Sequence, residues 1–592
     1  MSISNPNLPK LVVSLRQYSR QMFLHDLLAG ITVGLVALPL AMAFGIASGV
    51  TPQAGLYTAV VAGFLISALG GSRTQIGGPT GAFVVIVAGI VARFGLPGLA
   101  MVTVMAGIIL LAMGLTGLGS AVRFIPRPVV IGFTNGIAVL IASTQIKDFF
   151  GLRVGAVPSE FLPRMRLLIG HLPSLNWQAL AIGAATLAVM LILPRFTKRV
   201  PASIIALLAC TVACAMFHLP VETIGTRFGG IPRGLPPFAI PDFHAEHILP
   251  LIPSAFTVAL LAALESMLSA VVADGMTGDR HNPNVELVAQ GIANMTSPLF
   301  GGIPATGAIA RTATNIRSGA RSPVSGIVHA LTLLAILLVA APLASYIPLA
   351  TLAAVLFVVA YNMGEWREIG GILQLGFTAI SVWLVTFALT VFADLTVAVS
   401  VGMALAALVY IYRIAETTTV TPVTDDYIRD GLPHTLQGRI IPPYVTLLRI
   451  HGPFLFGTTE KLVEASVNVE AFEPVVILRL RNMTAIDATG IHAIETFAKR
   501  LTESRRTLLL CGAMEQPSKL LQQPRFLDHV GRENIMPNIQ AALNRAKEIR
   551  EASTPWPVET AVGRGCSPEK KPNNAPLGTA IAPCSPVGRS PK

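Results

Sequence analysis

Long apolar segments recur along the first 413 residues of this 592-residue chain. A helix that crosses a lipid bilayer needs about 20 apolar residues. Three segments are short or interrupted by glycine and proline, at 79–92, 284–300 and 307–318. Eleven others approach or reach the spanning length, at 26–47, 54–70, 97–119, 127–147, 177–194, 201–218, 250–272, 324–341, 347–361, 374–393 and 395–413. This pattern predicts a polytopic α-helical membrane protein with about fourteen spans, and excludes a disordered chain or an ordinary soluble enzyme.

Charged residues are spread unevenly along the chain. Residues 1–413 hold 22 basic and 13 acidic side chains, whereas the much shorter segment 414–550 holds 16 and 15. Such a change in charge density marks a boundary between a membrane part and a soluble part. We therefore expect five regions: an N-terminal segment 1–25, a transmembrane domain 26–413, a linker 414–435, a small soluble domain 436–550 and a tail 551–592.

The soluble part alternates strand and helix patterns. Strands are expected at 444–451, 474–481 and 507–511, with helices at 486–504 and 536–550 and a short segment at 517–522. Alternation of this kind is typical of a small α/β domain. The tail is rich in proline, glycine and serine and has no apolar period, so we expect it to be disordered.

Basic residues of the membrane part favour one orientation. The N-terminus and the predicted inner loops hold 14 of them, against 7 in the predicted outer loops. Because positive loops remain in the cytoplasm, we expect a multi-pass protein of the cell (inner) membrane with the N-terminus and the soluble domain inside. The net charge of +12 then concerns topology and anion handling, and we expect no nucleic acid partner.

A short motif occurs twice and suggests an internal repeat. Residues 77–82 (GGPTGA) return as 301–308 (GGIPATGA), about 225 positions later, and each copy opens one of the short segments. One copy follows the second span and the other follows the ninth. Because seven spans per repeat is an odd number, the two copies enter from opposite sides, as in inverted-repeat transporters.

Glycine and proline at membrane depth imply helices that begin inside the bilayer. Such a helix directs free N–H groups and the positive end of its dipole inward, which suits an anion. Close glycine-mediated helix packing is the alternative explanation. Two facing copies favour a binding site for a small anion, with the candidate ligands Gly78, Pro79, Thr80, Gly81, Ala82, Thr306, Gly307 and Ala308. Pro39 lies one repeat length before Glu265, so the first span should bend near the same centre and bring Phe44 close.

Glu265 is the one ionisable side chain in the run 252–272. Acidic groups at the middle of a span usually face a cavity and serve ion or proton movement. Burial favours the neutral form of a carboxyl group, so Glu265 could carry a proton. Ser269 lies one turn further on the same helix face. A protonated glutamic acid that only bonds a neighbouring helix is the structural alternative.

Arg311 and the two threonines each allow two interpretations. Arg311 lies one turn into the second short helix, where it could compensate anion charge or extend to the inner surface. Thr80 and Thr306 could bind the anion or cap helices. The loop residues Asp274, Asp279, Arg280 and His281 are interpreted as a solvated inner loop.

No pattern indicates a cofactor or a metal. The five cysteines form no CxxC pair, and we interpret Cys210 and Cys214 as packed thiols within one apolar run. There is no GxxxxGK[ST] loop and no metal-spaced histidine and cysteine cluster. ATP-driven transport is therefore not expected.

Several of these motifs together resemble the SulP family of anion transporters. GGPTGA at 77–82, the stretch from PQAGLY at 52–57 to GSR at 71–73, and GAIART at 307–312 resemble family signatures, although Ala54 replaces the usual aromatic residue. Asp487, Ala488, Thr489 and Gly490 resemble the turn of STAS domains. The resemblance implies two seven-span inverted repeats forming core and gate domains, a cytoplasmic STAS domain and a homodimer embedded in membrane lipid.

The resemblance also carries expectations about coupling and regulation. In the sodium-dependent bicarbonate members, an aspartate and a threonine help to hold Na⁺. The matching positions here are Glu265 and Ile309, and an isoleucine side chain cannot ligate a hard cation. This departure favours H⁺ over Na⁺. Thr489 matches a phosphorylation site of STAS antagonists and is a candidate regulatory residue.

Together these features predict a secondary active transporter, and proton-coupled uptake of sulfate is the leading expectation. Bicarbonate or a C4-dicarboxylate is the alternative substrate on the same fold. An anion channel and a membrane signalling protein acting through the STAS domain are further alternatives. A nucleobase carrier has a similar repeat plan, but the STAS-like domain argues against it.

Overall fold

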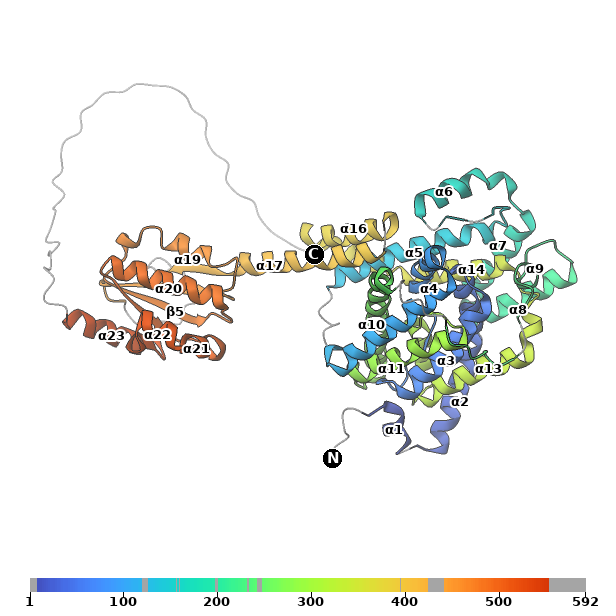
Figure 1. Cartoon of the computed structure of the whole chain (residues 1–592), viewed down its shortest axis with the longest axis horizontal. Coiled ribbons are helices and arrows are strands. Elements are labelled where there is room, and N and C mark those ends of the chain that lie inside the picture. The colour runs from blue at the N-terminus through green and yellow to red at the C-terminus, as the bar shows by residue number, and fades with distance from the viewer. Residues whose placement is uncertain are drawn as a thin grey trace, which may run out of the picture. The chain divides into compact units, whose positions relative to one another are not determined.

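The computed structural model describes residues 8–552 apart from 17, 120–125, 156, 159, 197–200, 232–233, 242–247, 394 and 424–440, and without the side chains of 395, 396 and 399. It divides the chain into a helical unit, Met1–Ile411, and an α/β unit, Tyr412–Lys592, both drawn in Figure 1. Most of the expected tail, from 553, and residues 424–435 of the expected linker lie outside the described residues.

Each of the fourteen segments expected from the sequence overlaps a helix of the structure. Within the described ranges, nine helices are long and apolar enough to cross a membrane. The helices of this part are α1 (Lys10–Leu15), α2 (Arg20–Ala47), α3 (Pro52–Leu69), α4 (Gly81–Leu115), α5 (Arg127–Phe149), α6 (Phe161–Gly170), α7 (Trp177–Phe196), α8 (Ala202–Met216), α9 (Ile224–Phe228), α10 (Ile248–Thr277), α11 (Pro283–Thr296), α12 (Ile309–Arg317), α13 (Val324–Ala344), α14 (Leu349–Met363), α15 (Trp366–Gln374), α16 (Phe377–Phe392) and α17 (Leu395–Thr417).

Helix α4 contains two of the expected segments, 79–92 and 97–119. Gly95 has φ 68°, outside the helical region, and Pro97 follows it. Glycine adopts positive φ without steric cost, and proline cannot donate a helical hydrogen bond. The chain therefore bends here, so that a short helix inside the bundle continues into a second one. Helices α6 and α15 were not expected from the sequence.

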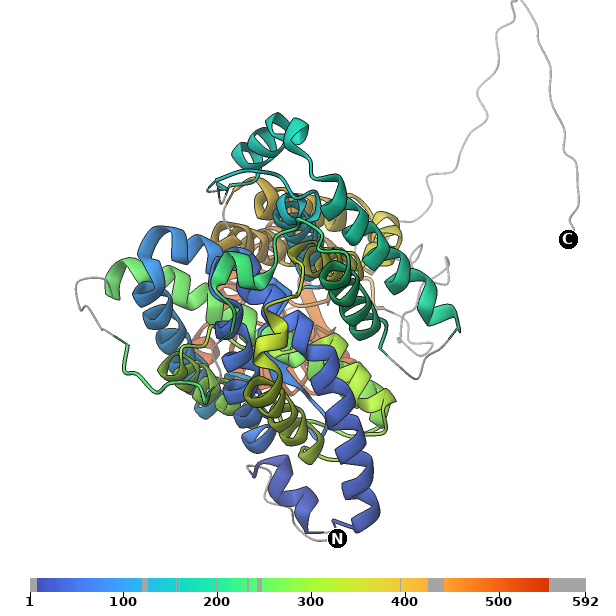
Figure 2. The same cartoon turned by 90° about the vertical axis from the view of Figure 1, so that its right-hand side faces the viewer.

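Helices of the first half pack against helices of the second half. Helix α2 lies beside α13, α3 contacts α11 and α13, and α4 contacts α10 and α11; Figures 1 and 2 show α2 and α13 side by side. Small residues allow the closest approaches, because a Cβ at Gly30 or Gly34 would collide with Val328 or Thr332. This interleaving places the two copies of the glycine motif next to each other.

The α/β unit is built on a five-stranded sheet with the order β3-β4-β5-β6-β7, in which β3 pairs antiparallel and the other pairs are parallel. Helix α20 packs over one face and α23 over the other. Strand β3 lies within the segment expected to be a linker. The elements are β3 (Thr419–Pro422), β4 (Val445–His451), α19 (Glu460–Ala465), β5 (Val475–Asn482), α20 (Ala488–Glu503), β6 (Thr507–Cys511), α21 (Glu515–Leu521), α22 (Pro524–Val530), β7 (Ile535–Met536) and α23 (Ile539–Ala552).

Candidate functional site

The two copies of the glycine motif meet as a pair of very short antiparallel strands. Strand β1 (Gly77–Gly78) pairs with β2 (Thr306–Gly307), with Gly77 opposite Gly307 and Gly78 opposite Thr306. Gly78 has φ 148°, a conformation that favours glycine. The pairing satisfies backbone groups that would otherwise be unpaired at membrane depth, where each would be costly.

A helix begins just after each strand. Helix α4 starts at Gly81 and α12 starts at Ile309. Their cap residues Thr80 and Ala308 make no side-chain cap hydrogen bond, so the first N–H groups of both helices remain available to a ligand. Because the strands are paired, the positive ends of both helices lie beside the same place, which we call the crossing of β1 and β2.

Phe44 lies at this crossing, as expected. An ideal Cβ on Gly81 would be 3.4 Å from Phe44 Cε1, so the ring of Phe44 faces the start of α4. Phe44, Ala82 and Ala308 are all buried. The start of α4 therefore lies in buried surroundings, where the attraction between a helix terminus and an anion is strengthened, whereas Ile309 and Ala310 at the start of α12 are exposed.

The helices α4 and α12, which begin inside the bundle, are called the first and the second half-helix. Glu265 joins the middle of α10 to the first half-helix. Its Oε2 accepts a hydrogen bond of 2.7 Å from Thr80 Oγ1. Glu265 also lines a cavity of about 30 Å³ together with Ala82, Val129, Val130, Phe133, Thr134, Ile137, Leu261, Leu264, Leu268 and Met403. Apart from Glu265 and Thr134, its lining is apolar. The carboxyl group thus lies beside both a helix N-terminus and a small cavity.

The serines after Glu265 contact the second half-helix instead. Ser266 Oγ lies 2.8 Å from Thr306 Oγ1 and accepts a 3.0 Å bond from the N–H of Gly307. Ser269 Oγ donates to Thr312 Oγ1 at 3.0 Å. One helix, α10, therefore contacts both half-helices, through Glu265 on one side and through its serines on the other.

Neither threonine is a helix-capping group. Thr80 occupies the cap position of α4, but its hydroxyl donates to Glu265. Thr306 lies two residues before the cap residue of α12 and donates to the carbonyl of Ala262 at 2.9 Å. Both hydroxyls thus fasten their strands to α10.

Arg311 does not reach the surface. Its side chain is 2% exposed and donates through Nη2 to the carbonyl oxygen of Pro79. An ideal Cβ on Gly78 would lie 2.7 Å from Arg311 Nη1. The extension of Arg311 to the inner surface, one of the two alternatives raised by the sequence, is therefore wrong. The guanidinium instead crosses from one repeat to the other and places a positive charge at the crossing.

Two buried polar residues near the crossing were missed by the sequence analysis. Gln75 precedes β1, and its amide lies against Gly307. His329 is fully buried in α13. His329 is the one ionisable residue between Val324 and Ala344, and an isolated ionisable residue in a span is the same signal that identified Glu265.

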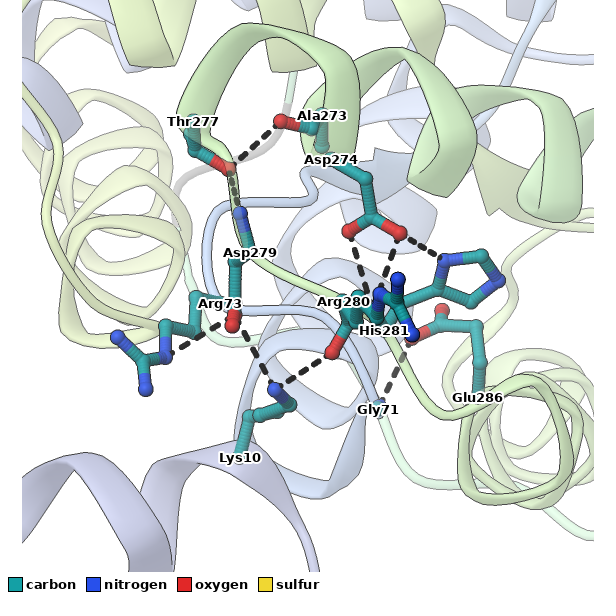
Figure 3. A network of polar contacts seen from close by, with 10 residues as sticks. All are labelled: Lys10, Gly71, Arg73, Ala273, Asp274, Thr277, Asp279, Arg280, His281 and Glu286. Carbon is teal, nitrogen blue, oxygen red and sulfur yellow. Dashed lines mark hydrogen bonds and ion pairs between the residues drawn. The ribbon is translucent and has the colours of Figure 1, made fainter.

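The loop between α10 and α11 is more ordered than a solvated loop. Figure 3 shows Asp279 Oδ2 beside Lys10 Nζ, at 3.1 Å, and Arg73 Nε, at 3.0 Å. His281 Nδ1 lies 2.7 Å from Asp274 Oδ2. The interpretation of these residues as merely solvated was wrong for Asp279, whose ion pairs fasten this segment to α1 and to the loop after α3. Asp274 and His281 contact each other within the segment.

In the α/β unit, Thr489 is exposed in the first turn of α20. The neighbouring Asp487 caps this helix, since its Oδ1 accepts from Gly490 N at 2.8 Å and its Oδ2 from Phe456 N at 3.0 Å. Thr489 lines a pocket together with residues that include His492 and Arg500.

Comparison with known proteins identifies both units. Residues 23–386 match the sulfate permease family, and residues 439–542 match the STAS domain. The protein of Bacillus subtilis (strain 168) named "Putative sulfate transporter YvdB" is 42% identical over 520 residues, which cover 88% of this chain and 97% of that protein. "Bicarbonate transporter BicA" of Picosynechococcus sp. (strain ATCC 27264 / PCC 7002 / PR-6) is 31% identical over 88% of this chain and 94% of its own length.

The fold has a solved counterpart at full length. The structure of SLC26A9 covers 92% of this chain and 94% of its own with a TM-score of 0.82 and 17% identity, a similarity that concerns the fold alone. Members of the matched family are transporters and not enzymes. The chain therefore belongs to the sulfate permease family and is a multi-pass membrane anion transporter that carries a STAS domain.

Proposed function

We propose that this protein takes up sulfate together with protons, and that the anion binds at the crossing of β1 and β2. The observation that carries the proposal is the hydrogen bond from Thr80 to Glu265. It places a carboxyl group next to the helix terminus that would receive the anion. A negative Glu265 would repel a dianion, whereas a protonated Glu265 would not. Proton entry would thereby be tied to anion entry.

The proposed anion ligands come from both half-helices. The proposed donors are the N–H groups of Gly81 and Ala82 at the start of α4 and the first N–H groups of α12. The N–H of Ala308, the cap residue of α12, already donates to the carbonyl of Ile76 at 2.8 Å. Arg311 adds a positive charge between the two half-helices. Oxyanions bind well to helix N-termini and arginine. Ser269 supports this geometry by holding α12 through Thr312.

Sodium coupling is less well supported by this arrangement. Ile309, the position that corresponds to a sodium-ligating threonine in the resembled transporters, opens α12 with an aliphatic side chain. Such a side chain supplies no oxygen for a hard cation. Without Na⁺, Glu265 would have to offset the negative charge of the entering anion by itself, and it can do so by binding a proton.

The expected orientation and assembly complete the proposal. We place the protein in the cell membrane with the N-terminus and the STAS domain in the cytoplasm, as the distribution of basic residues favours. A homodimer is proposed from the resemblance to the family. Phosphorylation of Thr489 is a further proposal, supported by the exposure of its hydroxyl.

Labelled sulfate uptake into sodium-free proteoliposomes tests the function. An inward proton gradient should accelerate uptake by the wild-type protein. The Glu265→Gln variant should keep sulfate binding or exchange but lose the part of this acceleration that Glu265 carries. Bicarbonate, succinate and chloride serve as unlabelled competitors. Unchanged proton dependence in Glu265→Gln would reject Glu265 as the proton carrier. Absence of sulfate uptake by folded protein would favour bicarbonate, the substrate that the name of BicA gives for that relative.

A further inference from the structure

Buried polar atoms without a hydrogen-bond partner gather around the crossing of β1 and β2. Both ring nitrogens of His329, both amide atoms of Gln75 and Nη1 of Arg311 have no partner among the described residues. His329 is 0% exposed and Gln75 is 4% exposed. An unpaired polar group in an apolar interior is costly. These groups therefore require ordered water or a bound ligand beside them.

The three side chains surround the same two strands. An ideal Cβ on Gly63 would lie 3.0 Å from the carbonyl oxygen of Gly77 and 3.7 Å from Cε1 of His329, so the ring and the strand share the space left by this glycine. Arg311 Nη1 lies against Gly78, the next residue of β1. His329 is consequently close to both the cation and the backbone of the proposed anion site.

Two effects oppose a proton on His329, its complete burial and the charge of Arg311. A guanidinium is always positive in a protein, so it opposes a second positive charge on a nearby imidazole. An anion at the crossing offsets the charge of Arg311 and removes this opposition. We propose that His329 is a second proton-binding site, which takes up a proton when the anion binds and releases it when the anion leaves. This inference rests on the proposed function and adds a proton carrier to it.

A line of polar groups begins one helical turn from His329 and runs toward the N-terminal segment, although the ring itself makes no hydrogen bond to a described residue. Ser325 lies one helical turn before His329 and accepts a 2.8 Å hydrogen bond from Asn315 Nδ2. Ser325 also donates to the carbonyl of Ser322 at 2.9 Å, and Ser322 Oγ donates to Asp26 Oδ2. Tyr18, near the N-terminus, donates to the same carboxylate at 2.9 Å. Asn315 Oδ1, beside this line, has no partner among the described residues.

Few other charges act on His329. Helix α13 packs against α2 and α3, whose buried ionisable groups are Asp26 and Tyr57. Asp26 accepts from Tyr18, from Ser322 and from the N–H of Arg321 at 2.6 Å, so its charge is compensated at the other end of the polar line. Beyond these helices, Glu265 and Arg311 face the crossing from α10 and α12. Besides its burial, the imidazole is therefore affected mainly by the charges of Arg311 and of a bound anion.

Linkage between sulfate binding and pH tests the inference on the purified full-length protein. Sulfate affinity is measured over a series of pH values, and the protons taken up per sulfate are measured with an indicator dye in weak buffer. With two proton sites the affinity of the wild type should change by more than tenfold per pH unit at its steepest, because each linked proton contributes up to about tenfold per unit. His329→Gln should lower the proton count. His171→Gln, at the end of α6, is the matched control.

The Glu265→Gln variant separates the two proposals. It should still take up protons through His329, which keeps the test decisive even if His329→Gln fails to fold. A Glu265→Gln variant whose sulfate affinity is independent of pH would overturn the inference and leave the proposed function intact. A wild-type protein that binds sulfate without proton uptake would overturn both. An unchanged proton count in His329→Gln would also refute the role of this histidine.

Discussion

The hydrogen bond from Thr80 to Glu265 can be removed without a change of shape. In Thr80→Val the hydroxyl is replaced by a methyl group, whereas Thr80→Ser keeps the donor. The bond is 2.7 Å long and lies in a largely buried site. A hydrogen bond to a charged group contributes about 1.5–3 kcal/mol. It stabilises the carboxylate form of Glu265, so its loss favours the protonated form.

This energy corresponds to a measurable displacement of the pH profile. One pH unit is equivalent to about 1.4 kcal/mol, so the pH of half-maximal proton-driven sulfate uptake should rise by about 1–2 units in Thr80→Val. Thr80→Ser should behave like the wild type. Thr103→Val is a control on the same helix, because the buried Thr103 hydroxyl donates only within α4, to the carbonyl of Leu99. A Thr80→Val profile that coincides with those of wild type and Thr103→Val would refute the coupling of Glu265 to the anion site.

Three further predictions follow from other contacts. Arg311→Met should weaken sulfate binding by about 10–100-fold, since a charge-assisted contact is lost, and Arg311→Lys should restore it incompletely; equal affinity of Arg311→Met and wild type in a binding assay would contradict this. Asp26→Asn should destabilise the folded helical unit by about 2–4 kcal/mol, because the buried carboxylate holds Tyr18, Arg321 and Ser322; thermal unfolding in detergent measures it, with Asp279→Asn as the partly exposed comparison. Burial raises the pKa of Cys511 from 9.0 to about 12, so its thiol should resist maleimide in the folded protein, as peptide mass spectrometry can determine. Rapid labelling of Cys511 in the folded protein near neutral pH would contradict this. Since the folded state keeps a thiol proton that the unfolded state releases, the stability of the STAS domain should also fall as pH rises above 9.

Sequence patterns predicted the membrane helices well because a bilayer imposes a length and a polarity on every span. The repeated motif also predicted that Thr80 and Thr306 would lie close together, and β1 and β2 do pair. Both inferences depend on the local sequence alone, namely on the length and polarity of each span and on the repeated motif.

Features set by contacts between distant segments were harder to predict. Strand β3 is four residues long and contains Pro422, so it has no alternating pattern and is recognisable only from its pairing with β4. The direction of the Arg311 side chain depends on the carbonyl of Pro79, 232 positions away. The amphipathic helix α6 resembles a loop because Arg164 and Arg166 interrupt its apolar residues. Asp279 likewise looked solvated because its partners, Lys10 and Arg73, lie more than 200 positions away in the sequence.

The pairing of β1 with β2 has a mechanical consequence for the transport cycle. Backbone hydrogen bonds between the two repeats fix the distance between the two half-helices, and Arg311 adds a side-chain tie across the same junction. A cycle that pulled the half-helices apart would have to break these bonds where no water replaces them. The two half-helices should therefore travel as one rigid piece with the anion between them. Because Glu265, Ser266 and Ser269 bond both half-helices to α10, access from either side of the membrane would then change by a movement of this piece together with α10 against helices that are not bonded to it.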